Sequence, residues 1–179
     1  MDPLDLYAHA SEWTLGKANA AALDLDAPTP CERWDVRALM NHVLETQQYF
    51  AGAARGLNVS PPGQDPPEII GDDPVGDLLD ARSLMLRTFG ENGNAAHAGP
   101  ALGIAFADML VHGWDLAVAG GQDTTMPEGL AEAAYGAIHG MFSDEQRSGV
   151  FGPELPVADD ASAQEKLLAY VGRDPSAGS

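Results

Sequence analysis

The chain has 179 residues, of which 45% are hydrophobic, so it has the size of one ordinary globular domain and can bury a core. Its 27 acidic residues outnumber its nine basic residues, and the formal net charge is -18. The basic residues are scattered, so this charge argues against nucleic acid and anionic membranes as partners, because their phosphate groups would be repelled.

Helical periodicity and its interruptions organise the first half of the chain. Apolar residues recur at roughly helical spacing from Leu4 to Leu23, and the prolines of APTPCERW then break the pattern. Asp35 is the expected N-cap of a second helix, which runs to about Arg55 and stops at Gly56. The proline-rich segment GLNVSPPGQDPPEIIGDDP follows as a loop, and loops of that length often border a functional site.

Further helices are predicted in the second half. We expect them over residues 75–89, about 102–119 and about 128–142. After an extended FGPELPV, a short helix begins at Ser162, Glu165 completes a capping box, and Gly172 stops it. Strands are limited to one or two short pieces near the tail. These elements predict an all-α fold: a four-helix bundle with an extra helix and a short C-terminal extension.

The N-terminus and the cysteine count point to the cell interior. The segment MDPLDLYAHASEW has acids where a signal peptide would carry basic residues, and no apolar run approaches the ~20 residues that span a bilayer. Cys31 is the only cysteine, which excludes an internal disulfide and a cysteine-based metal cluster within one chain. We therefore predict a cytoplasmic protein.

A polar stripe lies on the most apolar of the predicted helices. In the segment 101–119 every residue is apolar or glycine except Asp108, His112 and Asp115. At about 100° per residue these three fall within one stripe about 60° wide. Because an unpaired buried carboxylate costs several kcal/mol, the stripe should face a metal ion, an arginine or hydroxyl network, or an aqueous cleft. Internal hydrogen bonds between His112 and the two acids are the structural alternative.

His42 is a third candidate ligand, on a different helix. It lies about 60° from Leu39, at the edge of that helix's apolar stripe. In helical bundles, metal sites are assembled from side chains on facing helices. Two imidazoles and one carboxylate leave at least one coordination position for water or substrate, as in catalytic sites. We therefore predict that His42, Asp108 and His112 bind a metal, zinc first, with iron(II), nickel or manganese as alternatives.

Three segments together resemble a known family: TPCERWDVRALMNHV (29–43), FADMLVHGWDLAVAGGQ (106–122) and VADDASAQEKLLAYVGRDP (157–175). They are similar to the DinB-like superfamily, and within it to actinobacterial proteins related to mycothiol-dependent maleylpyruvate isomerase. The resemblance implies one metal-binding domain over residues 1–179, with His42, Asp108 and His112 holding a divalent metal, commonly zinc. The isomerase has glutamate where Asp108 stands, and the missing methylene retracts the carboxylate by about 1.5 Å.

The resemblance also implies a thiol cosubstrate. In such proteins the metal lowers the pKa of a bound low-molecular-weight thiol such as mycothiol, and the thiolate is the nucleophile. We therefore expect a mycothiol-dependent transferase or isomerase that acts on a small electrophile. Two other functions fit the same residues: a non-catalytic metal-binding or stress-response module, and a metal-free bundle that binds an organic ligand. An apolar face of the bundle could serve a homodimer.

Further residues are expected around the ligands. Asp115 accepts the second N–H of His112 or His42, or else pairs with an arginine of a neighbouring helix. Trp34 and Trp114 either anchor the two ligand-bearing segments by packing or line the substrate pocket. Cys31 is expected to be a small, semi-buried residue rather than a nucleophile, because only Arg33 is evident nearby to stabilise a thiolate.

Overall fold

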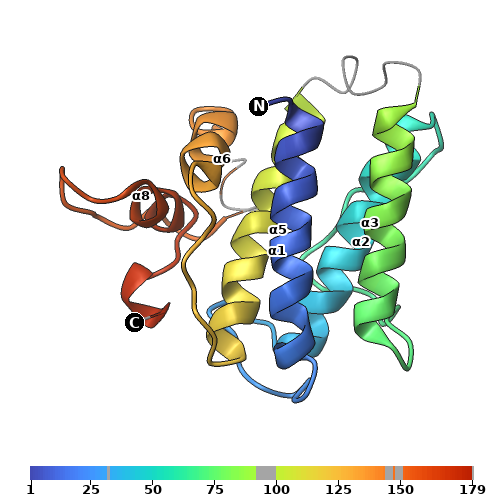
Figure 1. Cartoon of the computed structure of the whole chain (residues 1–179), viewed down its shortest axis with the longest axis horizontal. Coiled ribbons are helices and arrows are strands. Elements are labelled where there is room, and N and C mark those ends of the chain that lie inside the picture. Colours follow the sequence, from blue (N-terminus) through green and yellow to red (C-terminus); the bar gives the residue numbers. More distant parts are fainter. Residues whose placement is uncertain (32, 92–99, 144–146, 148–150, 179) are drawn as a thin grey trace.

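In the described residues, four long helices form a bundle, and two shorter helices extend it on one side (Figure 1). A computed structural model describes residues 1–31, 33–91, 100–143, 147 and 151–178. The long helices are α1 (Pro3–Ala21), α2 (Val36–Ala54), α3 (Pro74–Gly90) and α5 (Pro100–Ala119). The short ones are α6 (Leu130–Ile138), which packs on α5, and α8 (Ala163–Tyr170), which packs on α6 and precedes the 3-10 turn η1 (Pro175–Gly178). The described residues contain no strand, which confirms the all-α prediction.

The helix ends follow the chemistry expected of the sequence. The Asp35 carboxylate accepts a hydrogen bond from the Ala38 N–H at 2.8 Å and caps α2. Ser162 and Glu165 form the predicted capping box at the start of α8. The helix predicted over 128–142 is shorter than expected, because α6 ends at Ile138 and Gly140 follows in the left-handed region at a φ of 74°. A left-handed residue of this kind terminates a helix.

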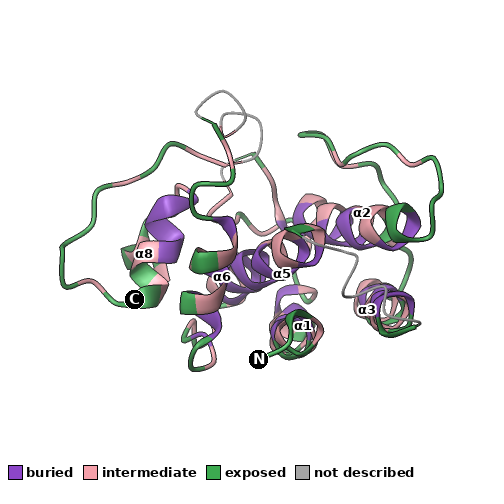
Figure 2. Ribbon diagram, turned by 90° about the horizontal axis from the view of Figure 1, so that it is seen from above, coloured by how far each residue is buried: buried purple, intermediate pink, exposed green. Residues whose placement is uncertain are grey.

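Helix α5 is the core of the bundle. Seen from above, it lies between α1, α2 and α6, and its ribbon is mostly buried (Figure 2). From residue 105 to residue 117 every residue is buried except Asp108. By length and composition α5 could cross a membrane, which was not expected from the sequence. However, 72% of its apolar window is buried inside the protein, as in the core helix of a folded domain.

Gly113 allows α1 to approach α5 closely. A Cβ atom at this position would overlap the Thr14 hydroxyl oxygen and the Trp13 ring. The same contact brings the Thr14 hydroxyl within 2.9 Å of the Met109 carbonyl oxygen, to which it donates a hydrogen bond. The glycine therefore sets the spacing of these two helices next to His112.

We expect Gly113→Ala to lower the free energy of unfolding by about 1–3 kcal/mol, the usual cost of overpacking a core. The new methyl group must displace Thr14 or Trp13, because neither lies at the end of a long flexible chain. Urea denaturation followed by circular dichroism measures this difference. Gly16→Ala is the matched control, because a Cβ atom there meets nothing within 4 Å; equal stability of the two variants would contradict the prediction.

Candidate metal centre

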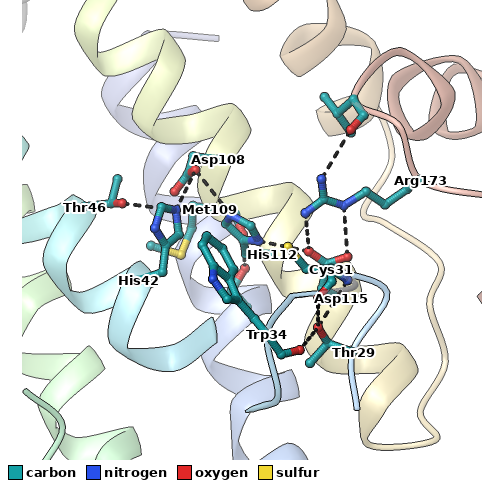
Figure 3. A network of polar contacts seen from close by, with 12 residues as sticks. Thr29, Cys31, Trp34, His42, Thr46, Asp108, Met109, His112, Asp115 and Arg173 are labelled. Carbon is teal, nitrogen blue, oxygen red and sulfur yellow. Dashed lines mark hydrogen bonds and ion pairs between the residues drawn. The ribbon is translucent and has the colours of Figure 1, made fainter. Parts of the chain in front are cut away.

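Helices α2 and α5 bring His42, Asp108 and His112 together (Figure 3). Asp108 lies between the two imidazoles. Its Oδ1 atom is 3.5 Å from His42 Nε2 and 3.4 Å from His112 Nε2. One ligand atom from each residue lies within 4.8 Å of the other two. Residues 42 and 108 are far apart in sequence, so this cluster is a product of the packing of α2 on α5.

The donor set and its spacing fit a small divalent cation. Two metal–ligand bonds of about 2.0–2.2 Å that meet at a tetrahedral angle place their ligand atoms about 3.3–3.6 Å apart. Both nitrogen–oxygen separations around Asp108 lie in this range. The aspartate is therefore long enough to reach both histidines although it is one methylene shorter than glutamate. Two imidazoles and one carboxylate also form a typical ligand set for zinc and other first-row metals.

Asp115 fixes the orientation of His112. Its Oδ2 atom lies 2.9 Å from His112 Nδ1, and its side chain is fully buried. With Nδ1–H donating to this carboxylate, His112 Nε2 is left to face Asp108 and His42, which is the arrangement that metal-binding histidines usually have. Asp115 also pairs with Arg173 at 2.8 Å. Asp115 thus contacts both His112 and an arginine, although this arginine follows α8 and does not belong to a neighbouring helix as expected.

His42 is supported differently, by packing. The Trp34 ring lies against it with the ring centroids 4.5 Å apart, and against His112 with the centroids 5.9 Å apart. Thr46, one turn further along α2, lies 3.4 Å from His42 Nε2 through its hydroxyl. The buried Nδ1 atom of His42 has no hydrogen-bond partner among the described residues. No carboxylate therefore holds this ring as Asp115 holds His112.

Two loops close over the candidate site on the side of Trp34. The Trp34 indole N–H donates to the Gln64 carbonyl oxygen at 3.0 Å, and Arg33 donates to the Gln64 side chain at 2.8 Å. Gln64 belongs to the long proline-rich loop that was expected to border a site. The histidine side chains are only 12% and 8% exposed, whereas Asp108 is 24% exposed. Solvent thus has its main access to the cluster next to Asp108.

The charges of the cluster reinforce one another in the metal-free protein. Burial alone would raise the pKa of Asp108, but the imidazoles of His112 and His42 outweigh burial and hold that pKa far below its ordinary value. Burial alone would lower the pKa of His112, but the carboxylates of Asp108 and Asp115 raise it from 6.5 to about 9. The metal-free site therefore carries a protonated His112 at neutral pH.

Zinc binding should release this proton. Because a metal binds the unprotonated imidazole, we expect the apparent zinc affinity to rise by up to about tenfold per pH unit below pH 9, and zinc binding at pH 7 to release about one proton from His112. The stability of the metal-free fold depends on pH in the opposite direction from zinc affinity. A raised pKa stabilises the fold fully below pH 6.5, and this contribution is lost as the pH rises through about 9.

Isothermal titration calorimetry in buffers of different ionisation enthalpy measures the number of protons released. Zinc binding at pH 7 without proton release would contradict the raised pKa of His112. A histidine whose pKa lay near its ordinary value would release only a fraction of a proton at that pH.

The other predicted residues have different places. Trp114 is fully buried in the core, two residues after His112 and thus on roughly the opposite side of α5. Cys31 is half-buried, and burial raises the pKa of its thiol, so that it stays protonated at neutral pH. Arg173, Thr46 and Gln64 were missed by sequence reasoning. Gln64 lies in the loop that was expected to border a site, and Arg173 directly follows the helix-stopping Gly172, whereas Thr46 has no comparable signal.

Known proteins resemble both the first third of the chain and its whole length. Residues 9–72 match the family model of the mycothiol maleylpyruvate isomerase N-terminal domain, a stretch that contains His42 but ends before α5. Uncharacterized protein MT0763 and Uncharacterized protein Rv0738, from two strains of Mycobacterium tuberculosis, are each 27% identical over 184 residues, which cover 97% of this chain and 98% of the relative. No solved structure matches the chain. The domain match over residues 9–72 and the all-helical fold of the described residues confirm the predicted resemblance to DinB-like proteins related to maleylpyruvate isomerase.

Proposed function

We propose that the chain binds a divalent metal through His42, Asp108 and His112 and uses it to bind a low-molecular-weight thiol. The observation that supports this proposal is the spacing of Asp108 Oδ1 from the two Nε2 atoms, 3.5 and 3.4 Å. Three protein ligands leave a coordination position for a small molecule. The domain match over residues 9–72 makes mycothiol the first candidate for the thiol.

The reaction we propose is the transfer of this thiol to a small electrophile or a thiol-assisted isomerisation. A divalent metal lowers the pKa of a thiol bound to it, so that thiolate forms near neutral pH. The protein's own residues orient the ligands and exclude water. Asp115 holds His112, Trp34 covers both imidazole rings, and Asp108 lies beside the solvent access.

Metal analysis is the first test of this proposal. Protein purified without an affinity tag and dialysed against zinc should retain about one equivalent. Wild-type protein that retains no more zinc than a control protein without a metal site would overturn the proposal. The favoured alternative would then be a metal-free bundle that binds an organic ligand.

Thiol binding is the second test. Cobalt(II) can replace zinc in such sites and gives a near-ultraviolet charge-transfer band when a thiolate binds it. We expect mycothiol to produce this band and its unreactive S-methyl derivative to produce none. The same band with free cysteine at equal concentration would show binding of thiols in general rather than selection of mycothiol.

A non-catalytic metal-binding module is the second candidate function. The position of Trp34 favours it, because a ring that lies against both imidazoles leaves less room for a second reactant beside the cluster. A panel of small electrophiles with mycothiol and the zinc-loaded protein separates the two. Thiol conjugates or isomerised products support the enzyme, and thiol binding without turnover supports the module.

We also propose that residues 1–179 form one domain in the cytoplasm. Packing supports a single domain, because α5 contacts α1, α2 and α6, and α6 contacts α8. The burial of α5 inside the fold supports the location. Limited proteolysis should therefore leave no smaller stable core, and sedimentation will show whether a homodimer forms.

A further inference from the structure

Arg173 is placed by the end of helix α8. Gly172 lies in the left-handed region at a φ of 81°, and its N–H donates to the Ala169 carbonyl oxygen at 3.1 Å. The Arg173 N–H donates back to the Leu168 carbonyl oxygen at 2.8 Å. This pair of bonds is the Schellman arrangement, which ends a helix and turns the chain back on it. A side chain at Gly172 would also collide with the backbone of Gly152. This position therefore requires glycine for two reasons, its left-handed backbone and the lack of space for a Cβ atom.

The Arg173 guanidinium faces inward and forms a bidentate ion pair with the Asp115 carboxylate. Nη2 donates to Oδ2 at 2.8 Å and Nε donates to Oδ1 at 3.3 Å. Its remaining nitrogen, Nη1, donates to the Val171 carbonyl oxygen at 3.2 Å. The Arg173 side chain is only 9% exposed and Asp115 is fully buried. Since every guanidinium nitrogen has an internal partner, Arg173 is not arranged to contact a substrate.

One carboxylate oxygen connects Arg173 to the metal centre. Asp115 Oδ2 accepts from Arg173 Nη2 at 2.8 Å and from His112 Nδ1 at 2.9 Å (Figure 3). A bidentate ion pair fixes the plane of a carboxylate, and the fixed Asp115 carboxylate in turn fixes the orientation of the His112 ring. On the other side of this ring, His112 Nε2 lies 3.4 Å from Asp108.

We propose that Arg173 is a positioning residue of the metal centre, and that docking of the segment after α8 is required to hold His112 in its metal-binding orientation. This inference rests on the proposed metal-binding function. It adds that metal binding depends on Arg173, which lies 58 residues after Asp115 in the chain. The C-terminal part of the protein then has a defined task. The candidate ligands all belong to the four-helix bundle, and the segment that contains Gly172 and Arg173 supplies the residue that orients one of them.

The test compares zinc affinities, measured by competition with a chromophoric chelator, in folded variants. Arg173→Met should weaken zinc binding by about 10- to 100-fold, the usual effect of removing a group that orients a metal ligand. Lys166→Met, at a half-buried position of α8 where the amino group donates to the Asp159 carbonyl oxygen and not to Asp115, is the matched control and should stay at the wild-type value. In an Asp115→Asn background, Arg173→Met should have little further effect, because its influence passes through Asp115.

A second readout needs no metal. The His112 Nδ1–H proton should give a protected resonance in nitrogen-15 spectra of the metal-free wild type, and Arg173→Met should abolish its protection. If Arg173→Met does not fold, Arg173→Lys provides the same test, since it keeps the charge and loses the bidentate ion pair. Arg173→Lys should weaken zinc binding at least several-fold.

Three results would overturn the inference: a folded Arg173 variant with wild-type affinity and a protected Nδ1–H, an equal loss in Lys166→Met, or an undiminished effect of Arg173→Met when Asp115 is already Asn. Wild-type protein that binds no zinc would overturn the proposed function instead. The Nδ1–H resonance would then still show whether Arg173 orients His112.

Discussion

Replacing His42 by alanine is expected to lower the zinc affinity by at least about a hundredfold. Structural zinc sites have total binding free energies of about 10–16 kcal/mol for four ligands, so one ligand accounts for about 3 kcal/mol. The remaining pair, Asp108 and His112, belongs to a single helix, and the described part of the chain places no other histidine, cysteine or carboxylate in this cluster. Chelator competition and metal analysis after dialysis measure the loss.

The control for this experiment is His9→Ala, since His9 is an exposed histidine on α1 outside the cluster. It should keep the full zinc content. The metal-free forms of both variants should unfold at similar urea concentrations, which separates ligand loss from misfolding. Stoichiometric zinc in His42→Ala would show that a different residue is the third ligand.

Asp115→Asn is expected to destabilise the metal-free protein by about 3–5 kcal/mol, because it leaves the buried Arg173 guanidinium without its counter-charge. The pKa of Asp115 supports this expectation. Burial would raise it, but Arg173 first and His112 second outweigh burial and lower it, so the carboxylate is charged throughout the neutral range. Urea denaturation in the presence of a chelator measures the loss without any contribution from bound metal.

A double variant sharpens this prediction. Asp115→Leu with Arg173→Met removes both charges, and we expect it to recover more than half of the loss, because a buried ion pair can be replaced by apolar side chains at little cost. Asp80→Asn, an exposed acid on α3, is the matched control. An Asp115→Asn variant as stable as this control would show that the buried pair does not stabilise the fold.

The sequence predicted the polar cluster because its residues stand out against their background. Three polar side chains in a helix that is otherwise apolar have few physical explanations, and the position of His42 at the edge of an apolar stripe narrows them further. The helices themselves were predictable from caps and periodicity, as Asp35 and the Ser162–Glu165 box illustrate. In each of these cases the information lies within one or two turns of a single helix.

What the sequence did not predict depends on how distant segments pack. The Trp34 ring lies against both imidazoles, and its indole N–H is bonded to Gln64, 30 residues later in the chain. The helix stop at Gly172 was predictable, but nothing in the local pattern identifies the arginine after it as the partner of Asp115. This pairing becomes visible only when α8 is placed against the rest of the protein.

The two imidazoles differ in how firmly they are held. His112 is hydrogen-bonded at Nδ1 to a fixed carboxylate, whereas His42 has a stacked ring, one hydroxyl neighbour and an Nδ1 atom without a partner among the described residues. A pair of one rigid and one adjustable ligand adapts to ions of different radius. In the proposed site, size alone should therefore discriminate little between zinc, nickel, iron and manganese. We expect the supply of each ion in the cell, together with the general order of metal affinities, to decide which ion such a site would hold.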